Sequence, residues 1–244
     1  MSGKLLPGVS HAALRAIAAD LRAQRGSIPD VIVALLSKHG RDAIAQMLEM
    51  LAADREEAER AADQRVELVW SGPEVEGAAT RDTAVVVRDL FRTARKSVLV
   101  AGYAVYDGAT VFEALWQRWA ERPELSIELY LNVARPDGDK DPDDIIVARY
   151  RHRFFTYDWP WERRPNVFYD PRSLLMTNGP KSVLHAKCVV IDDAKAFVTS
   201  ANLTEAAQYR NIEAGVLLHD IHLATRLSEQ FRQLQMRGFV RPLN

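Results

Sequence analysis

The sequence has very little cysteine: Cys188 is the single thiol in 244 residues. One cysteine cannot form a disulfide within the chain, which is typical of proteins that work in a reducing compartment. Because Cys188 lies in an apolar stretch, we expect it to be a small buried hydrophobic residue and not a reactive thiol.

The chain also lacks an apolar run near the ~20 residues that a membrane span needs, and its N-terminus lacks the hydrophobic region of a signal peptide. Its formal net charge of -1 gives no global attraction to nucleic acid or anionic membranes, so polyanion binding has to come from a local patch. With 48% hydrophobic and 27% charged residues, the composition is that of an ordinary globular protein. We therefore expect a cytoplasmic protein with no membrane partner.

The spacing of apolar residues changes near residue 65. Before that point they recur three and four residues apart, as in Leu14, Ile17, Ala18 and Leu21, and again in Ile44, Met47, Leu48 and Leu51. This spacing is typical of helices. After it, strand-like and helix-like segments alternate. We predict a helical module over residues 1–65 and an α/β domain over residues 66–244.

The second part is predicted to form a mixed, largely parallel sheet with helices on both faces. The predicted strands cover 66–70, 97–103, 125–133, 166–169, 183–191, 196–200 and 211–218. The predicted helices cover 80–96 with Thr80 as N-cap, 110–121, a short segment from Thr204, and 222–236. The loops 71–73 and 103–108 follow strands, so they either line a ligand cleft or are ordinary turns.

Polar residues gather around the predicted strand 183–191. His185 and Lys187 are two residues apart, so their side chains share one face of a strand. The next predicted strand, 196–200, would bring Ser200 and Asn202 back beside the imidazole. An imidazole, an ammonium and an amide at one end of a sheet suit a phosphate or oxyanion site.

These residues resemble the signature of the phospholipase D superfamily, HxKx4D followed by (G/S)SxN. His185, Lys187 and Asp192 match the first element, and Ser200 and Asn202 match the second. The resemblance implies a phospholipase D-like α/β fold, a mixed sheet flanked by helices on both faces.

The likeness extends beyond this signature. Asn211-Ile212-Glu213 is similar to the NxE element of the small nuclease-like members of the superfamily. The chain also resembles the phospholipase D-like proteins of the DISARM bacterial phage-defence system. The resemblance lies in its length, in the element Trp70-Ser71-Gly72-Pro73 and in the single motif near the C-terminus.

The resemblance implies a phosphodiesterase that needs no metal or other cofactor. His185 would attack phosphorus and form a phosphohistidine, while a second histidine protonates the leaving oxygen and then activates water. Lys187 and Asn202 would hold the non-bridging oxygens. Supporting roles fall to Ser200 as a hydrogen-bond donor, Glu213 as the group that orients His185, and Asp192 as a brace.

The mechanism needs two histidines, but the chain contains only one HxK. His152 lies between two arginines and has no lysine two positions on. The simplest hypothesis is a two-fold homodimer in which His185 of each chain faces its mate across a shared cleft.

Arginine and aromatic residues alternate over 149–165. Guanidinium groups contact phosphates and aromatic rings stack on unpaired bases, which makes five residues candidates for substrate binding: Arg149, Arg151, Arg153, Trp159 and Trp161. In the alternative interpretation, the aromatics are core or dimer-interface anchors and the arginines extend over them.

Our leading hypothesis is a metal-independent nuclease of a bacterial antiphage defence system, with DNA favoured over RNA and other defence-system proteins as further candidate partners. The alternatives are a weakly active or inactive nucleic-acid-binding scaffold subunit, and a phospholipase. His219 and His222 could pair as metal ligands, but no cysteine or carboxylate spacing supports a metal site.

Overall fold

The chain divides into two compact units, residues 1–64 and 65–244, in a computed structural model. The structure describes residues 6, 8–26, 28–73, 81–176, 182–204 and 211–243. The predicted N-cap Thr80 and the residues of the short helix predicted after Thr204 lie outside the described residues.

The N-terminal unit is built from three helices, α1 (His11–Ala23), α2 (Asp30–Leu36) and α3 (Arg41–Arg65). Ion pairs join α1 to α3 at His11–Glu59, Arg15–Glu56 and Arg22–Glu49. In these pairs the residue numbers increase along α1 while those of the partners decrease along α3, so the two helices run antiparallel. Their apolar faces meet in a small core: Leu14, Ala18, Leu21, Ile44, Ala45, Leu48 and Ala52.

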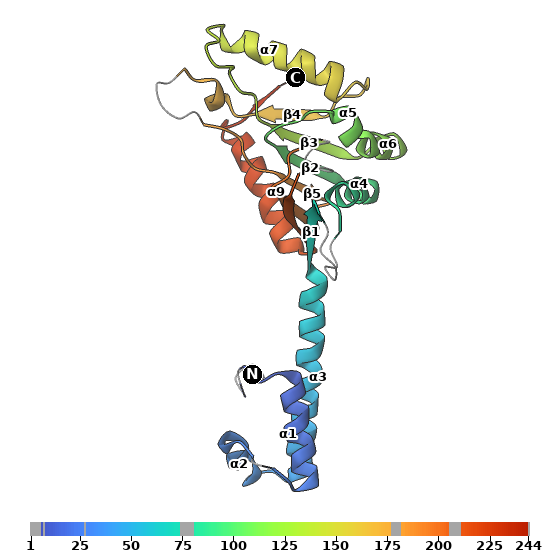
Figure 1. The fold of residues 1–244 in the computed structure, drawn as a ribbon, viewed down its shortest axis with the longest axis vertical. Helices are drawn as coiled ribbons and strands as arrows, with labels where there is room; N and C mark the ends of the chain where they lie inside the picture. The colour runs from blue at the N-terminus through green and yellow to red at the C-terminus, as the bar shows by residue number, and fades with distance from the viewer. Residues whose placement is uncertain are drawn as a thin grey trace. The chain divides into compact units, whose positions relative to one another are not determined.

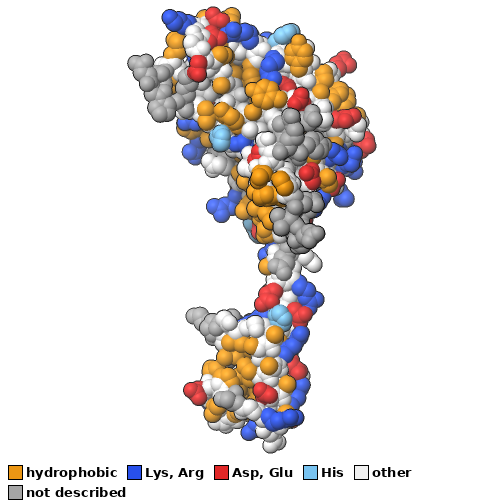
Figure 2. Space-filling view, viewed as in Figure 1, with side chains coloured by type: hydrophobic (Ala, Val, Ile, Leu, Met, Phe, Trp, Pro, Cys, Tyr) orange, Lys and Arg blue, Asp and Glu red, His pale blue; other side chains and the backbone are white. Residues whose placement is uncertain are grey.

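An apolar groove of about 440 Å³ opens on this helical unit, and hydrophobic side chains are visible on its surface in Figure 2. Ile32 and Leu35 of α2 line it together with Met47 and Met50 of α3. Among the described residues, no helix is both long enough and apolar enough to cross a membrane.

The second unit contains one eight-stranded sheet in the order β1-β7-β6-β5-β2-β3-β4-β8. The strands are β1 (Val66–Ser71), β2 (Ser97–Gly102), β3 (Ser126–Leu131), β4 (Asn166–Tyr169), β5 (Cys188–Ile191), β6 (Lys195–Thr199), β7 (Glu213–Leu218) and β8 (Arg241–Pro242). Within it, β2, β3 and β4 are parallel neighbours and the other pairs are antiparallel. The sheet is therefore mixed, as predicted, but not largely parallel, because β5 pairs antiparallel with both β2 and β6, and β6 pairs antiparallel with β7.

Helices cover both faces of the sheet, as the sequence predicts (Figure 1). One face carries α4 (Thr83–Thr93), α5 (Gly108–Val111) and α6 (Glu113–Glu121), and the other carries α9 (Ile221–Met236). The other helical elements among the described residues are α7 (Asp143–Arg153), the π-helical turn η2 (Phe154–Asp158) and the 3-10 turn η3 (Pro171–Leu174).

The N-cap of α4 is Asp82, not the predicted Thr80. Its carboxylate accepts hydrogen bonds from the backbone N–H groups of Ala84 (2.8 Å) and Val85 (3.3 Å). Aspartate caps a helix at least as well as threonine, and α4 begins directly after Asp82.

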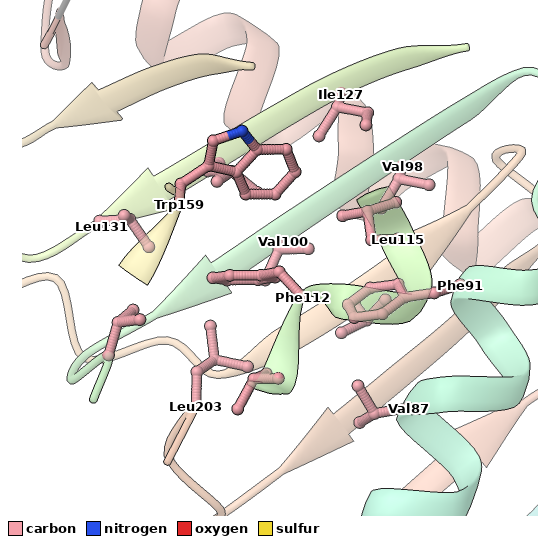
Figure 3. Packing of buried hydrophobic residues seen from close by; sticks show 14 of the residues in the cluster. Val87, Phe91, Val98, Val100, Phe112, Leu115, Ile127, Leu131, Trp159 and Leu203 are labelled. Carbon is pink, nitrogen blue, oxygen red and sulfur yellow. The ribbon is translucent and has the colours of Figure 1, made fainter. Parts of the chain in front are cut away.

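The larger core lies between the sheet and the helices α4, α5 and α6, as Figure 3 shows. Val98, Val100 and Ile127 of the strands belong to the same buried cluster as Phe112 and Trp159. The rings of Phe112 and Trp159 have centroids 5.6 Å apart. This core fixes the positions of β2 and β3, whose ends meet the candidate site.

Candidate active site

His185 and Lys187 lie in an irregular segment directly before β5, not inside a strand. The predicted strand 183–191 is wrong in its first half, because β5 begins only at Cys188. The two side chains nevertheless come together. The Lys187 Nζ atom is 3.3 Å from Nε2 and 3.4 Å from Nδ1 of His185. It also donates to the carbonyl oxygen of His185 at 3.2 Å.

Tyr103 contacts both members of this pair from the loop that follows β2. Its ring centroid is 4.7 Å from that of His185, and the Lys187 ammonium lies 5.5 Å from the Tyr103 centroid. The sequence left two interpretations of the loop 103–108, a cleft lining or an ordinary turn. Its Tyr103 contacts the candidate site. β5 is antiparallel to β2, with Cys188 opposite Ala101, so the start of β5 meets the end of β2.

An open groove of about 490 Å³ brings the polar residues together. Its lining includes His185, Lys187 and Ser200, together with the apolar side chains of Leu227 and Phe231 from α9. A polar cluster at the sheet end thus borders an apolar wall.

Ser200 and Glu213 form the second part of the site. The Ser200 hydroxyl donates to Glu213 Oε2 at 2.5 Å and accepts from the Ala214 backbone N–H at 3.1 Å. Asn211 Nδ2 donates to Glu213 Oε1 at 3.3 Å. Among the described residues, no hydrogen bond joins Glu213 to His185. The predicted contact is absent from a single chain, in which the described partners of the two Glu213 carboxylate oxygens are Ser200 and Asn211.

Asn202 and Lys187 both line a small hollow, and Lys187 lines the groove as well. The Asn202 Oδ1 atom is buried, and it has no hydrogen-bond partner in the part of the chain that the structure describes. A buried amide oxygen without a donor costs about 1–3 kcal/mol. A ligand or a second chain that supplied a donor would recover this energy.

Asp192 occupies the opposite end of β5 from His185. Its carboxylate accepts hydrogen bonds from the backbone N–H groups of Arg95 (3.1 and 3.0 Å), Lys96 (2.6 Å) and Ser97 (3.0 Å). Its φ angle of 56° places it in the left-handed region, at the turn between β5 and β6. Asp192 therefore joins this turn to the start of β2, which is the arrangement of a brace and not of a substrate contact.

The three candidate arginines of α7 differ in their surroundings. Arg149 forms ion pairs with Asp139 (2.6 Å) and Asp141 (3.1 Å) on the surface. Arg151 is exposed and has no ion-pair partner among the described residues. Arg153 pairs with the buried Asp158 at 3.0 Å, and burial raises the pKa of that carboxyl against the opposing effect of the Arg153 charge.

The structure corrects the proposed role of Trp159. Its side chain is 0% exposed, and its Nε1 donates to the Arg163 carbonyl oxygen at 2.8 Å, so the ring cannot stack on a base. Trp161 is partly buried against the same core and stacks on Trp116 with centroids 5.5 Å apart. For Trp159, the alternative interpretation as a core anchor describes what is found, whereas the partly buried Trp161 stays a candidate for substrate binding.

Cys188 is buried, as predicted, and burial raises the pKa of its thiol to about 12. His219 does not pair with His222 but with Glu67, at 2.6 Å. Across the described ranges, no group of three or more His, Cys, Asp or Glu side chains is arranged to hold a metal ion.

Two contacts of the site were not identified from the sequence. Tyr103 directly follows the apolar strand β2, and its ring contact with His185 depends on how β5 pairs with β2. Tyr106 is a second exposed tyrosine in the same loop, and its ring lies near Arg153. The only signal in the sequence is their place in a loop that follows a strand.

The described site lies within a segment that matches a known family. A family model described as "Cardiolipin synthase, PLD-like domain" matches residues 87–235. The expected similarity to a DISARM protein is also found: "DISARM protein DrmC" of Bacillus paralicheniformis is 26% identical over 174 residues, which cover 71% of this chain. The match spans 65% of the length of that relative, which is less than two thirds.

Two solved structures are similar to this chain, and the one with a TM-score above 0.5 shows the same fold. Phosphatidylserine synthase of Haemophilus influenzae Rd KW20 has a TM-score of 0.52 and 18% identity, covering 77% of this chain and 43% of that chain. NucT from Helicobacter pylori has a TM-score of 0.49 and 18% identity, covering 70% of this chain and 96% of that chain.

The family match covers more than half of the chain and includes the whole cluster from His185 to Glu213. The protein therefore belongs to the phospholipase D-like family.

Proposed function

We propose that this protein is a phosphodiesterase that uses His185 as its nucleophile and cleaves nucleic acid as part of an antiphage defence system. The observation that carries the proposal is the contact between His185 and Lys187. An imidazole with an ammonium 3.3 Å away, in an open groove, can attack a phosphodiester whose negative charge the ammonium offsets.

The reaction proceeds in two displacements. A ring nitrogen of His185 forms a bond to phosphorus while the bond from phosphorus to the leaving oxygen breaks, and a second histidine gives that oxygen its proton. Water then attacks phosphorus and gives a proton to the second histidine. The bond between phosphorus and nitrogen breaks, which releases a phosphate monoester and free His185.

Charge on the phosphoryl oxygens is offset by side chains. Lys187 supplies a positive charge and Asn202 supplies amide hydrogen bonds, and the two line the same hollow. Ser200 is held in place by Glu213, so its position beside the groove is fixed before substrate binds. On this account the reaction runs without a metal ion.

A second copy of the chain supplies the second histidine. Among the described residues, no other histidine contacts His185 or Lys187, and Asn202 Oδ1 lacks a donor. A two-fold homodimer would place His185 of each chain in one shared cleft. The assembly is part of the proposal.

The place of the protein in defence is proposed from its similarity to DISARM protein DrmC. Because the match covers 65% of that relative, contacts with other defence-system proteins are also proposals. We propose DNA before RNA as the substrate, and the cytoplasm as the location.

The test is a cleavage assay in excess EDTA on labelled single-stranded DNA, duplex DNA, RNA and phosphatidylglycerol vesicles, with His185→Ala alongside. The proposal predicts nucleic-acid cleavage that persists in EDTA and is lost in the variant. Tight, salt-sensitive binding without cleavage would identify a scaffold subunit. Release of lipid headgroups without nucleic-acid cleavage would identify a phospholipase.

A further inference from the structure

The loop that follows β2 is held in a fixed position beside the proposed catalytic residues. The Leu203 backbone N–H donates to the Ala104 carbonyl oxygen at 3.1 Å, and the Tyr106 N–H donates to the Leu203 carbonyl oxygen at 3.2 Å. Val105 and Leu203 are both buried. Because Leu203 follows Asn202 directly, these bonds fix the backbone of Tyr106 next to the phosphate-binding residues.

Tyr106 presents a largely exposed ring from this loop. Its side chain is 61% exposed, and the guanidinium carbon of Arg153 lies 5.7 Å from the ring centroid. The position of Arg153 is set by Asp158 at 3.0 Å and by the Val105 carbonyl oxygen at 3.5 Å. The ring is thus supported by a cation while much of its surface remains open to solvent.

Asp158 links this arrangement to the fold. Besides Arg153, its carboxylate accepts a hydrogen bond from the Gly108 backbone N–H at 3.2 Å. A Cβ at Gly108 would lie 2.8 Å from the backbone of Asp158, so only glycine allows this approach. The π-helical turn η2 and the loop after β2 are therefore packed closely, and Arg153 cannot move far from Tyr106.

The same loop extends to the nucleophile. Tyr103 is 36% exposed, and its ring lies 4.7 Å from His185. Two partly open aromatic rings, three residues apart, thus extend from the proposed nucleophile toward a positively charged side chain. This is the combination with which proteins bind single-stranded nucleic acid: aromatic faces for the bases and arginine beside the backbone.

We infer that Tyr106, supported by Arg153, stacks on the unpaired base next to the scissile phosphate, so that the preferred substrate is single-stranded nucleic acid. This inference rests on the proposed function. In a duplex the faces of the bases are covered by their neighbours, whereas an unpaired base offers its face to Tyr106. Stacking of this kind accepts any base, so the site is tolerant of sequence.

The experiment compares the full-length protein with Tyr106→Leu, Tyr106→Phe and Tyr157→Leu. Tyr157 is a matched control because it is another exposed tyrosine, at 68% exposure, on η2. The substrates are a labelled single strand, its duplex, and the same strand with tetrahydrofuran abasic positions around the cleavage point. Each is also used for equilibrium binding to the His185→Ala background.

Tyr106→Leu is expected to raise KM for the single strand about five- to 150-fold, the change that corresponds to losing one base–aromatic stack, and to leave KM for the abasic strand unchanged. Tyr157→Leu is expected to behave like the wild type. Tyr106→Phe keeps an aromatic face and is expected to retain most of the affinity for the single strand that Tyr106→Leu loses. An equal loss on the abasic strand, no loss at all, or preferred cleavage of the duplex or of phosphatidylglycerol vesicles would overturn the inference.

The equilibrium binding measurements test the stacking inference independently of the proposed phosphodiesterase activity. If the wild type cleaves no substrate, the proposed phosphodiesterase fails. Weaker binding of the single strand, but not of the abasic strand, by Tyr106→Leu in the His185→Ala background would then still support stacking. Unchanged binding would overturn it.

Discussion

The Lys187 ammonium lies within 3.4 Å of both ring nitrogens of His185, although the two residues precede β5. The Thr199 backbone N–H of β6 donates to the Lys187 carbonyl oxygen at 3.1 Å. Tyr103 packs against the same imidazole. The spacing of two residues thus brings the proposed nucleophile and the proposed charge-stabilising cation together at the end of the sheet.

Replacing Lys187 by an uncharged residue should lower kcat by a larger factor than it raises KM. Lys187→Met is expected to lower kcat about 10²–10³-fold, the usual loss when one stabilising group for transition-state charge is removed. Lys195→Met, at the start of β6, is the matched control and should retain wild-type rates. Steady-state cleavage in EDTA measures both. An unchanged kcat for Lys187→Met would contradict the role of the ammonium.

Ser200 and Glu213 should behave as a coupled pair, because the Ser200 hydroxyl donates to the carboxylate at 2.5 Å. In a double-mutant cycle, Ser200→Ala and Glu213→Gln are expected to show a coupling of about 0.5–3 kcal/mol in the free energy of unfolding. Urea unfolding of the four proteins measures it. Additive effects would mean that the hydrogen bond contributes nothing to stability.

Replacing Asp192 should lower the free energy of unfolding and change kcat little. Asp192→Ala removes the acceptor for three backbone N–H groups and is expected to lower the free energy of unfolding by about 2–4 kcal/mol. Asp192→Asn keeps an acceptor oxygen and tolerates the left-handed backbone, so it should cost less. Denaturant unfolding tests the order. A normal stability with lost kcat would instead place Asp192 in the chemistry.

Trp159→Ala should destabilise the fold by about 3–5 kcal/mol, as is usual when a large buried aromatic is removed. Its folded fraction should bind single-stranded DNA like the wild type, because the ring is enclosed in the core. Calorimetry and fluorescence anisotropy measure the two properties. A selective loss of DNA binding at full stability would restore Trp159 as a substrate contact.

Cys188 should make stability fall at high pH. Burial raises the pKa of the folded thiol to about 12, while the unfolded thiol titrates near ~8.5. The stabilising contribution is complete below the unfolded pKa and is lost as pH rises from there toward 12. Between pH 9 and 10, wild type should lose about 1 kcal/mol more unfolding free energy than Cys188→Ala. Parallel pH profiles for the two proteins would contradict this.

The features that follow from short spacings could be predicted from the sequence. His185 and Lys187 meet because they are two residues apart, and Cys188 is buried because its neighbours are apolar. The partner of Glu213 could not be predicted, because it depends on the pairing of β6 with β7. The burial of Trp159 could not be predicted either. An aromatic residue near arginines occurs both in cores and on binding surfaces, and only the tertiary packing decides between the two.

The most direct test of the central claim is to trap the covalent intermediate. A labelled single-stranded substrate is mixed with the protein in EDTA, quenched with alkali and digested, and the labelled peptide is sequenced by mass spectrometry. The account predicts a phosphoramidate on the peptide that contains His185, absent from His185→Ala. Continued cleavage by His185→Ala in EDTA, or an adduct on another residue, would contradict it.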